Sequence, residues 1–217
     1  MRNWERYRNH LQRGDWQLHT DYTDGRSSIK EYFDEATNRG CNFLFFSEHV
    51  RKELTYDYLA FKEEVYRIGS FYEIDFAVGA EVKVLPDMSL DISESILKEV
   101  DLLSFSYHSK YFSTKEEYIK SIINVLSNNR VDIWAHPTSY QNWLGFDLNR
   151  QDYELIFETM KINNVVYEFN KKYPLPSLIE LQIVKEMNLV CTFSSDAHHK
   201  SELLTVKDRI FFENFLG

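Results

Sequence analysis

Imidazole and carboxylate side chains recur at one kind of position in this sequence, directly after short apolar segments. Five of the seven histidines lie there, namely His19, His49, His108, His136 and His198. Three carboxylates occupy comparable positions, namely Asp24, Glu81 and Asp196. One such histidine would usually be a hydrogen-bonded buried ring, but five of them favour a shared site. Nitrogen and oxygen ligands without thiolates suit zinc, manganese or iron better than magnesium or calcium, so the sequence predicts a transition-metal site.

The apolar segments themselves predict seven buried strands, at residues 16–18, 42–46, 74–80, 101–106, 131–135, 165–169 and 190–193. Apolar residues at helical spacing predict helices between them, at residues 28–39, 55–68, 114–126, 151–162 and 176–187. This alternation is typical of parallel strands joined by crossover helices and predicts an α/β fold, an irregular seven-stranded (β/α)7 barrel. An open doubly wound sheet is the alternative, although no glycine-rich phosphate loop follows a strand. In a barrel, the carboxyl ends of the strands converge on one mouth and would gather the histidines there.

Length and composition favour one domain over residues 1–217, because no linker-like segment interrupts the 217 residues and 43% of them are hydrophobic. Residues 1–14 precede the first strand as an N-terminal helical extension. Trp4, Tyr7 and Leu11 share one helical face in it, which favours a short helix closing the barrel bottom over a partner-binding arm.

The net charge of −9 disfavours a nucleic-acid partner without excluding one, because binding to the phosphate backbone normally requires a basic face. Apolar segments are far shorter than a membrane span, so we expect a cytoplasmic protein without a membrane partner. Cys41 and Cys191 read as buried, reduced thiols. Nothing in the composition indicates an oligomeric state.

Six short motifs make the pattern specific. HTDYTDG, SEHV, GAEV, SYHS, AHP and SDAH occur in this order within residues 16–198. In order and spacing they resemble the polymerase and histidinol phosphatase (PHP) family of metal-dependent phosphoesterases. An amidohydrolase barrel also gathers histidines at strand ends, but it usually carries His-x-His and a bridging lysine, which are not found here.

The resemblance implies two or three divalent transition-metal ions, zinc, manganese or iron. The first would be bound by His19, Glu81 and Asp196, the second by Glu81, His108 and His136, and the third by Asp24, His49 and His198. The family's first motif usually reads His-x-His, and Gln17 stands where its first histidine belongs. A neutral amide oxygen is a weaker ligand than imidazole, so the first site should bind its ion more loosely or accept a harder one.

The resemblance also implies an activity, the hydrolysis of a small phosphomonoester, as in histidinol phosphatases, by a metal-bridged hydroxide. Glu81 would bridge two metals, Asp196 would hold or deprotonate the hydroxide, and His198 would help the leaving oxygen depart. A nuclease or nucleotide phosphatase of the same family is an alternative. A catalytically weakened barrel that serves as a binding module is another, and the Gln17 replacement motivates it.

Residues near the predicted mouth supply candidates for substrate contacts. These are Arg51, Lys83, Lys110 and Asn170, with Arg26 and Lys171 as further cations. Polar residues that could orient the ligands are Ser47, Glu48, Ser106, Thr138 and Ser195. Aromatic residues of the mouth loops, which could stack on a substrate or simply pack, are Tyr107, Tyr111, Tyr140, Trp143 and Tyr173. We expect His10 on the surface and His199 pointing away from the site.

Overall fold

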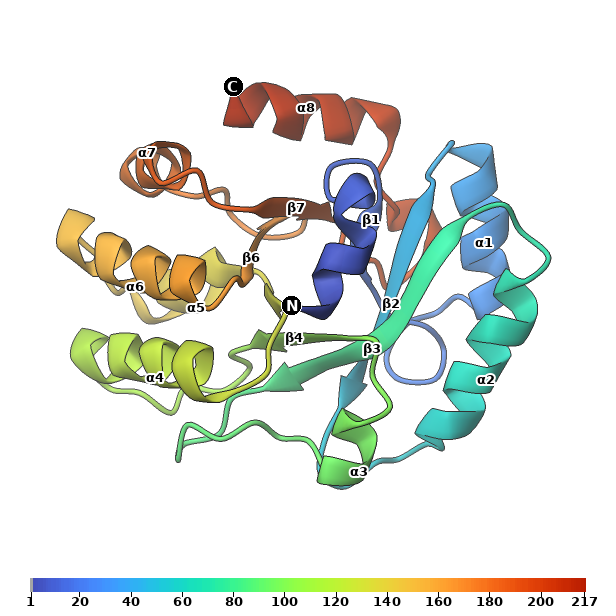
Figure 1. Ribbon diagram of the computed structural model, residues 1–217, viewed down its shortest axis with the longest axis horizontal. Coiled ribbons are helices and arrows are strands. Elements are labelled where there is room, and N and C mark those ends of the chain that lie inside the picture. The colour runs from blue at the N-terminus through green and yellow to red at the C-terminus, as the bar shows by residue number, and fades with distance from the viewer. Residues whose placement is uncertain (1) are drawn as a thin grey trace.

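The structure, a computed structural model, describes residues 2–217 of the chain. Seven parallel strands follow one another in sequence order and form a nearly closed barrel, with helices around it (Figure 1). The strands are β1 (Asp15–Leu18), β2 (Phe43–Val50), β3 (Asp75–Lys83), β4 (Leu102–Ser106), β5 (Ile133–Trp134), β6 (Val166–Asn170) and β7 (Cys191–Ser194). The predicted α/β barrel is therefore confirmed.

Most of the connecting helices begin at a residue whose side chain caps the helix, and the helix at Pro137–Leu144 is an exception. The helices are α1 (Ile29–Asn38), α2 (Tyr58–Gly69), α3 (Glu94–Leu97), α4 (Lys115–Asn128), α5 (Pro137–Leu144), α6 (Arg150–Ile162), α7 (Leu178–Glu186) and α8 (Val206–Leu216), with 3₁₀ helices η1 (Asn3–His10) and η2 (Lys200–Glu202). Capping boxes start α1, α4, α6, α7 and α8, in which the N-cap side chain and an acidic side chain three residues later each bond the other residue's backbone N–H. Within residues 2–217, no helix combines the length and the apolar character that crossing a membrane requires.

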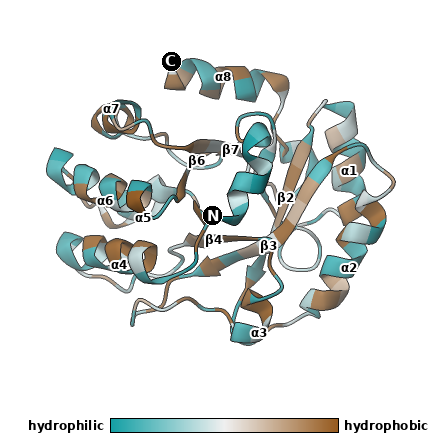
Figure 2. Cartoon of the chain, viewed as in Figure 1, coloured by the Kyte–Doolittle hydropathy of each residue, from teal (hydrophilic) through white to brown (hydrophobic). Residues whose placement is uncertain are grey.

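Two apolar clusters hold the barrel together. The larger lies between the strands and the surrounding helices and includes Leu44 and Phe46 of β2. The smaller includes Phe43 and Phe45, on the opposite face of the same strand, together with the buried Trp4 of η1. In Figure 2 the strands are mostly hydrophobic, whereas the helices carry residues of both kinds. The N-terminal helix thus packs against the barrel end at which the strands begin.

The barrel closes next to two candidate ligands. An isolated parallel bridge joins Leu18 of β1 to Ala197, just beyond β7. The N–H of His19 donates to the carbonyl oxygen of Ala197 at 2.8 Å. Because Ala197 lies between Asp196 and His198, the contact that closes the barrel also positions both of these side chains.

Two strands extend further toward the mouth than the sequence predicts. β2 continues to Val50 and β3 to Lys83, whereas the predicted strands end at residues 46 and 80. His49 and Glu81 therefore lie on regular strands and are directly paired across them. The apolar pattern ends early because polar side chains replace apolar ones where the strands reach the site. Three helices, α3, α5 and α8, were not predicted; α3 and α5 are short, and α8 mixes apolar and polar residues without a clean helical stripe.

Candidate metal centre

Glu81 is the centre of the polar cluster at the barrel mouth. It is 1% exposed, and its Oε1 lies 3.0 Å from His108 Nε2 and 2.8 Å from His136 Nε2. Its Oε2 lies 3.2 Å from His49 Nδ1 and 3.4 Å from His19 Nε2. Burial opposes ionisation of this carboxyl, but His108 and the other imidazoles outweigh it and hold the pKa of Glu81 well below its usual range.

Two further carboxylates complete the cluster. Asp196 Oδ1 lies 3.1 Å from His19 Nε2. The Asp24 carboxylate lies 3.4 Å from His49 Nε2 and 3.4 Å from His198 Nε2. Hydrogen bonds from His198 and His49 hold the pKa of Asp24 well below its ordinary value. All eight residues that the resemblance assigned to metal binding therefore converge on one site.

The cluster fits divalent metal ions. Ligand atoms of His19, His49 and His198 lie within 4.8 Å of one another, and so do those of His49, Glu81 and His108. Both ring nitrogens of His19 and Nδ1 of His49 are buried without a hydrogen-bond partner among the described residues. Buried polar atoms are normally paired, so His19 Nε2 and His49 Nδ1, which lie near carboxylates without bonding them, fit a cation bound between imidazole and carboxylate.

Two of the candidate ligands have a strained backbone. His136 (φ 32°) and Asp196 (φ 51°) adopt the left-handed conformation, which costs residues other than glycine about 1–3 kcal/mol. His136 precedes Pro137, the first residue of α5, and its backbone N–H donates to the buried carboxylate of Glu168. Burial raises the pKa of Glu168 to about 7. Burial disfavours a charge on His136, but the hydrogen bond and charge of Glu81 outweigh it and raise the pKa of His136 to about 9.

Glu48 positions the loop that carries Asp24. Its side chain is fully buried and accepts hydrogen bonds from the N–H of Thr20, at 2.6 Å, and from the hydroxyl of Thr23. Gly25 lets the same loop fold tightly, because a Cβ there would lie 2.1 Å from the carbonyl oxygen of His19. Glu48 thus does not face solvent, and it holds the loop next to Asp24.

A family model of the PHP domain matches residues 15–182. The chain belongs to the PHP family. It is 26% identical over 203 residues to the DNA polymerase/3'-5' exonuclease PolX of Bacillus subtilis (strain 168), an alignment that covers 86% of this chain and 34% of that protein. It is also 26% identical over 185 residues to a protein named "Probable phosphatase" from Thermoanaerobacter sp. (strain X514), covering 79% of this chain and 73% of that one. The chain thus spans about a third of the polymerase and most of the smaller relative.

Solved structures share the PHP fold. A candidate histidinol phosphatase, hisK, from Listeria monocytogenes superposes with a TM-score of 0.70 at 14% identity, covering 87% of this chain and 96% of that chain. A two-domain protein from Bacteroides vulgatus with a PHP-like metal-dependent phosphoesterase domain gives a TM-score of 0.54 at 15% identity, covering 87% of this chain and 52% of that chain. These likenesses concern the fold.

Gln17, which replaces a histidine of the usual PHP motif, is hydrogen-bonded to the side-chain amide of Asn170. It is buried, and its Oε1 accepts a hydrogen bond from Asn170 Nδ2 at 3.2 Å. The same amide group donates to Glu168 Oε2 at 3.1 Å, and Asn170 Oδ1 accepts from the N–H of Lys172. Asn170, proposed from the sequence as a substrate contact, is therefore a buried link between Gln17 and Glu168. Because the side-chain oxygen of Gln17 already accepts this hydrogen bond, it would make a poor metal ligand.

Asp91 attracts two of the cations that the sequence offered as substrate contacts. The guanidinium of Arg51 lies 4.0 Å from Asp91 and donates to the carbonyl oxygen of Val50 at 2.7 Å. Lys83 Nζ lies 3.4 Å from the same carboxylate. Lys110 Nζ lies 4.7 Å from the ring centre of Trp143, at the rim of the mouth.

Lys172 is the cation that the sequence analysis missed. Its Nζ lies 3.1 Å from Asp196 Oδ2 and 3.2 Å from His198 Nδ1, and its side chain is 45% exposed. Lys171 instead pairs with Asp208 at 2.8 Å. The sequence does contain a signal for Lys172. Side chains alternate between the two faces of an extended segment, so the side chain of Lys172 should lie on the same inward face as that of Asn170.

The two histidines that were not assigned to the site lie outside the cluster. His10 lies at the opposite barrel end, where it pairs with Asp75 at 3.0 Å and stacks on Phe43, and its side chain is only 19% exposed. The expectation of a surface residue is thus wrong, because the N-terminal segment packs on the barrel. His199 bonds Ser201 and caps η2 away from the cluster.

Among the polar residues expected to orient the ligands, Ser106 bonds His108 Nε2 at 2.6 Å. Ser195 bonds Asp15, Ser47 bonds Leu18, and Thr138 bonds Pro174. Ser139, which the sequence analysis did not single out, lies 2.9 Å from His136 Nδ1.

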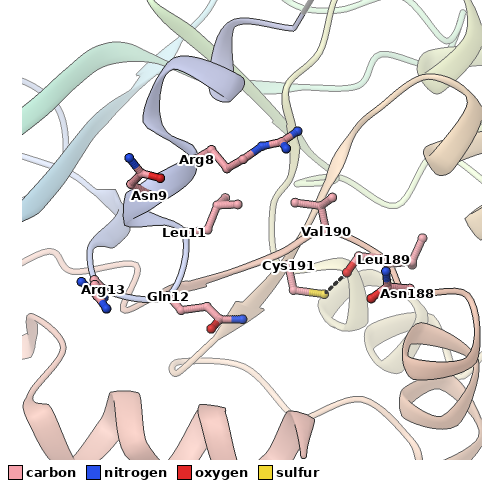
Figure 3. Close-up of a pocket in the computed structure, with 9 residues that line it drawn as sticks. All are labelled: Arg8, Asn9, Leu11, Gln12, Arg13, Asn188, Leu189, Val190 and Cys191. Atoms are coloured by element: carbon pink, nitrogen blue, oxygen red, sulfur yellow. Dashed lines mark hydrogen bonds between the residues drawn. The ribbon is translucent and has the colours of Figure 1, made fainter.

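A cavity of about 640 Å³ lies far from this centre, between η1 and the turn that leads into β7 (Figure 3). Arg8, Leu11 and Arg13 line one side of it, and Leu189 and Cys191 the other. The guanidinium of Arg8 lies 5.3 Å from the Trp4 ring, and the thiol of Cys191 donates to the carbonyl oxygen of Leu189. Cys41 and Cys191 are both free and buried, as the sequence predicted.

Proposed function

We propose that this chain is a metal-dependent phosphatase that hydrolyses a small phosphomonoester. The observation that carries the proposal is the convergence of four imidazoles on Glu81, with Asp24 and Asp196 beside them. Membership of the PHP family and the likeness to the Thermoanaerobacter protein support it. Divalent ions bound here would supply Lewis-acid activation of water and of the phosphoryl oxygens.

Two or three transition-metal ions, zinc, manganese or iron, suit this donor set. His19, Glu81 and Asp196 would hold the first ion, and Glu81, His108 and His136 the second. Asp24, His49 and His198 would hold the third. Gln17 would contribute weakly at the first site, because its carbonyl oxygen is already bonded to Asn170.

The chain's own residues would orient the reactants. Asp196 is 3% exposed and can accept the proton of an attacking water at Oδ1. Lys172 can release Asp196 and bind a phosphoryl oxygen through Nζ, as a point charge on a flexible stem. His198 lies at the open side of the cluster, with a 19% exposed side chain, and can assist departure of the alcohol oxygen. Arg51 and Lys83 would reach a substrate only by leaving Asp91.

The proposed substrate is small because the spaces beside the centre are small. A cavity of about 450 Å³ flanks Lys172 and Asp196, and another of about 450 Å³ flanks His108 and His136. The net charge of −9 also disfavours a long polyanion. The second candidate substrate is the end of a nucleic-acid strand, because the B. subtilis relative is named as a 3'-5' exonuclease.

The test is metal content per chain, combined with hydrolysis of an aryl phosphate before and after addition of manganese or zinc. We expect two or three ions per chain and turnover that depends on them. Glu81→Gln should lose the first two ions and the turnover. The unaltered protein should cleave an oligonucleotide poorly. Turnover of the oligonucleotide alone would favour the nuclease. At most one weakly held ion without turnover would favour the binding module.

A further inference from the structure

A pocket with aromatic walls opens beside the centre, on the side of His108 and His136. Its volume is about 450 Å³, and its walls include Tyr107, Asn142, Trp143 and Tyr173. We call this space the aromatic pocket. Its lining residues come from the loop after β4, from helix α5 and its N-cap residue, and from the segment after β6. Because both histidines touch Glu81, at 3.0 Å and 2.8 Å, any group in the pocket is adjacent to the reacting position.

Trp143 is unusual among the tryptophans of this chain. Its side chain is 51% exposed, whereas Trp4, Trp16 and Trp134 are at most 3% exposed. Its ring contacts the buried Tyr140 edge-on at 6.1 Å, and Lys110 Nζ lies 4.7 Å from its centre. These contacts hold the ring in place while leaving much of it open, as expected for a stacking surface.

Tyr173 supplies a second ring in the same pocket. It packs on the imidazole of His136 with ring centres 4.5 Å apart. The pocket thus offers two aromatic side chains next to the centre. The Tyr173 ring packs on the candidate ligand His136, and Trp143 belongs to helix α5.

Hydrogen-bonding groups are few in the aromatic pocket. The Tyr107 hydroxyl bonds Ser121, and Ser139 bonds His136 Nδ1 at 2.9 Å, which leaves the Asn142 amide and the Tyr173 hydroxyl for a bound group. A polyol such as a sugar would need a partner for each buried hydroxyl, and unpaired hydroxyls would cost binding energy. A flat apolar ring needs no such partners and would bury its faces against Trp143 and Tyr173.

We propose that the aromatic pocket binds a planar ring on the alcohol side of the ester, so that the preferred substrates are aryl or heteroaryl phosphomonoesters. The inference rests on the proposed phosphatase activity and specifies its substrate class. The phosphoryl group would lie at the centre, with Lys172 on one side and the ring in the aromatic pocket on the other.

The first readout is specificity. In metal-loaded protein, Trp143→Ala should lower kcat/KM for phenyl phosphate and phosphotyrosine by about tenfold, since the ring contact and the apolar area that it buries are lost together. It should leave glycerol phosphate and glucose phosphate nearly unchanged, and Trp143→Phe should restore much of the aryl preference. Phe71→Ala is the matched control, because Phe71 is an aromatic residue that is 81% exposed on another loop. Equal loss on aryl and alkyl esters, or no loss, would overturn the proposal.

The second readout does not require turnover. Trp143 is the accessible tryptophan, so phenylphosphonate should protect the protein's fluorescence from acrylamide, and alkyl phosphonates should not. Protection without hydrolysis of any ester would retain the aromatic pocket and reject the phosphatase. Hydrolysis without aryl preference or protection would retain the phosphatase and reject the aromatic pocket.

Discussion

At the scale of single residues, Glu81 places the strongest constraint on any interpretation. A carboxylate that is 1% exposed can stay ionised only with compensating charge, and four neutral imidazoles supply dipoles but no net charge. Either the histidines bind protons or the cluster binds cations. Three histidine nitrogens without hydrogen-bond partners favour cations, because protonated rings would be expected to bond the nearby carboxylates.

Three histidine variants should therefore differ in metal content and turnover. His108→Ala or His136→Ala should remove the second metal and lower kcat/KM by about 10³-fold, since a Lewis-acid ion contributes several kcal/mol to the transition state. His10→Ala removes a histidine of the opposite barrel end and should change neither property. Metal content by elemental analysis and aryl phosphate turnover are the measurements. Similar losses in all three variants would contradict the assignment of the centre.

Gln17→His tests the departure from the family's motif. The new imidazole would replace an amide whose oxygen is bonded to Asn170, and it would offer the first site a stronger ligand for a transition ion. We expect at least about tenfold tighter zinc or manganese binding at the weakest site, because one more imidazole would contact the ion. Competition with a fluorescent chelator would measure it. Unchanged affinity would mean that position 17 does not contact the ion.

The residue types of the centre could be predicted from the sequence, but the roles of several neighbours could not. Histidines and carboxylates after apolar segments identified all eight converging side chains. Lys172 was missed because the sequence does not show that its neighbour Lys171 pairs with Asp208 of the last helix, whereas Lys172 pairs with Asp196. Such partners are set by tertiary packing and not by spacing along the chain.

At the scale of elements, strand ends determine where the ligands lie. The seven strands were predictable because their apolar residues form continuous runs. The ends of β2 and β3 were not, because both strands continue past the last apolar residue of the run into the polar mouth. The particular contacts that close β1 on the segment after β7 could not be predicted, because they join residues far apart in the chain. One of them is the buried Asp15, which accepts hydrogen bonds from Ser195 and from the N–H of Leu204.

Asp15→Ala should therefore affect both stability and metal binding. Its loss would leave buried N–H groups of Ser195 and Leu204 without partners and lower the free energy of unfolding by about 3 kcal/mol. Because Ser195 precedes Asp196, the first metal should also bind about tenfold more weakly, as for other groups that orient ligands. Denaturant unfolding and zinc titration would measure the two effects.

Asp132→Ala is the matched control for this prediction. Asp132 is likewise buried and accepts from backbone N–H groups of Asn3, Trp4 and Leu103 at the other barrel end. A comparable loss of stability with unchanged metal affinity is expected. Weaker metal binding in both variants would show that general destabilisation, and not the placement of Asp196, loosens the site.

At the scale of the whole molecule, metal binding and barrel closure are coupled through the same residues. His19 and Ala197 join the first and last strands, and the side chains of His19, Asp196 and His198 all point into the centre. Bound ions would link elements that begin and end the chain, and they would offset part of the net charge of −9. Metal removal should consequently act on global stability as well as on activity.

Chelation is therefore expected to lower the melting temperature. An ion present at about a hundredfold excess over its Kd stabilises the fold by about 2.7 kcal/mol, which for a chain of this size corresponds to about 5–10 °C. Scanning calorimetry with and without EDTA would measure the shift, and added manganese or zinc should reverse it. The Glu81→Gln protein keeps only the third candidate site and should show a much smaller shift with EDTA, whereas His10→Ala should retain the full shift. A shift of equal size in Glu81→Gln would place the stabilising ions elsewhere on the barrel.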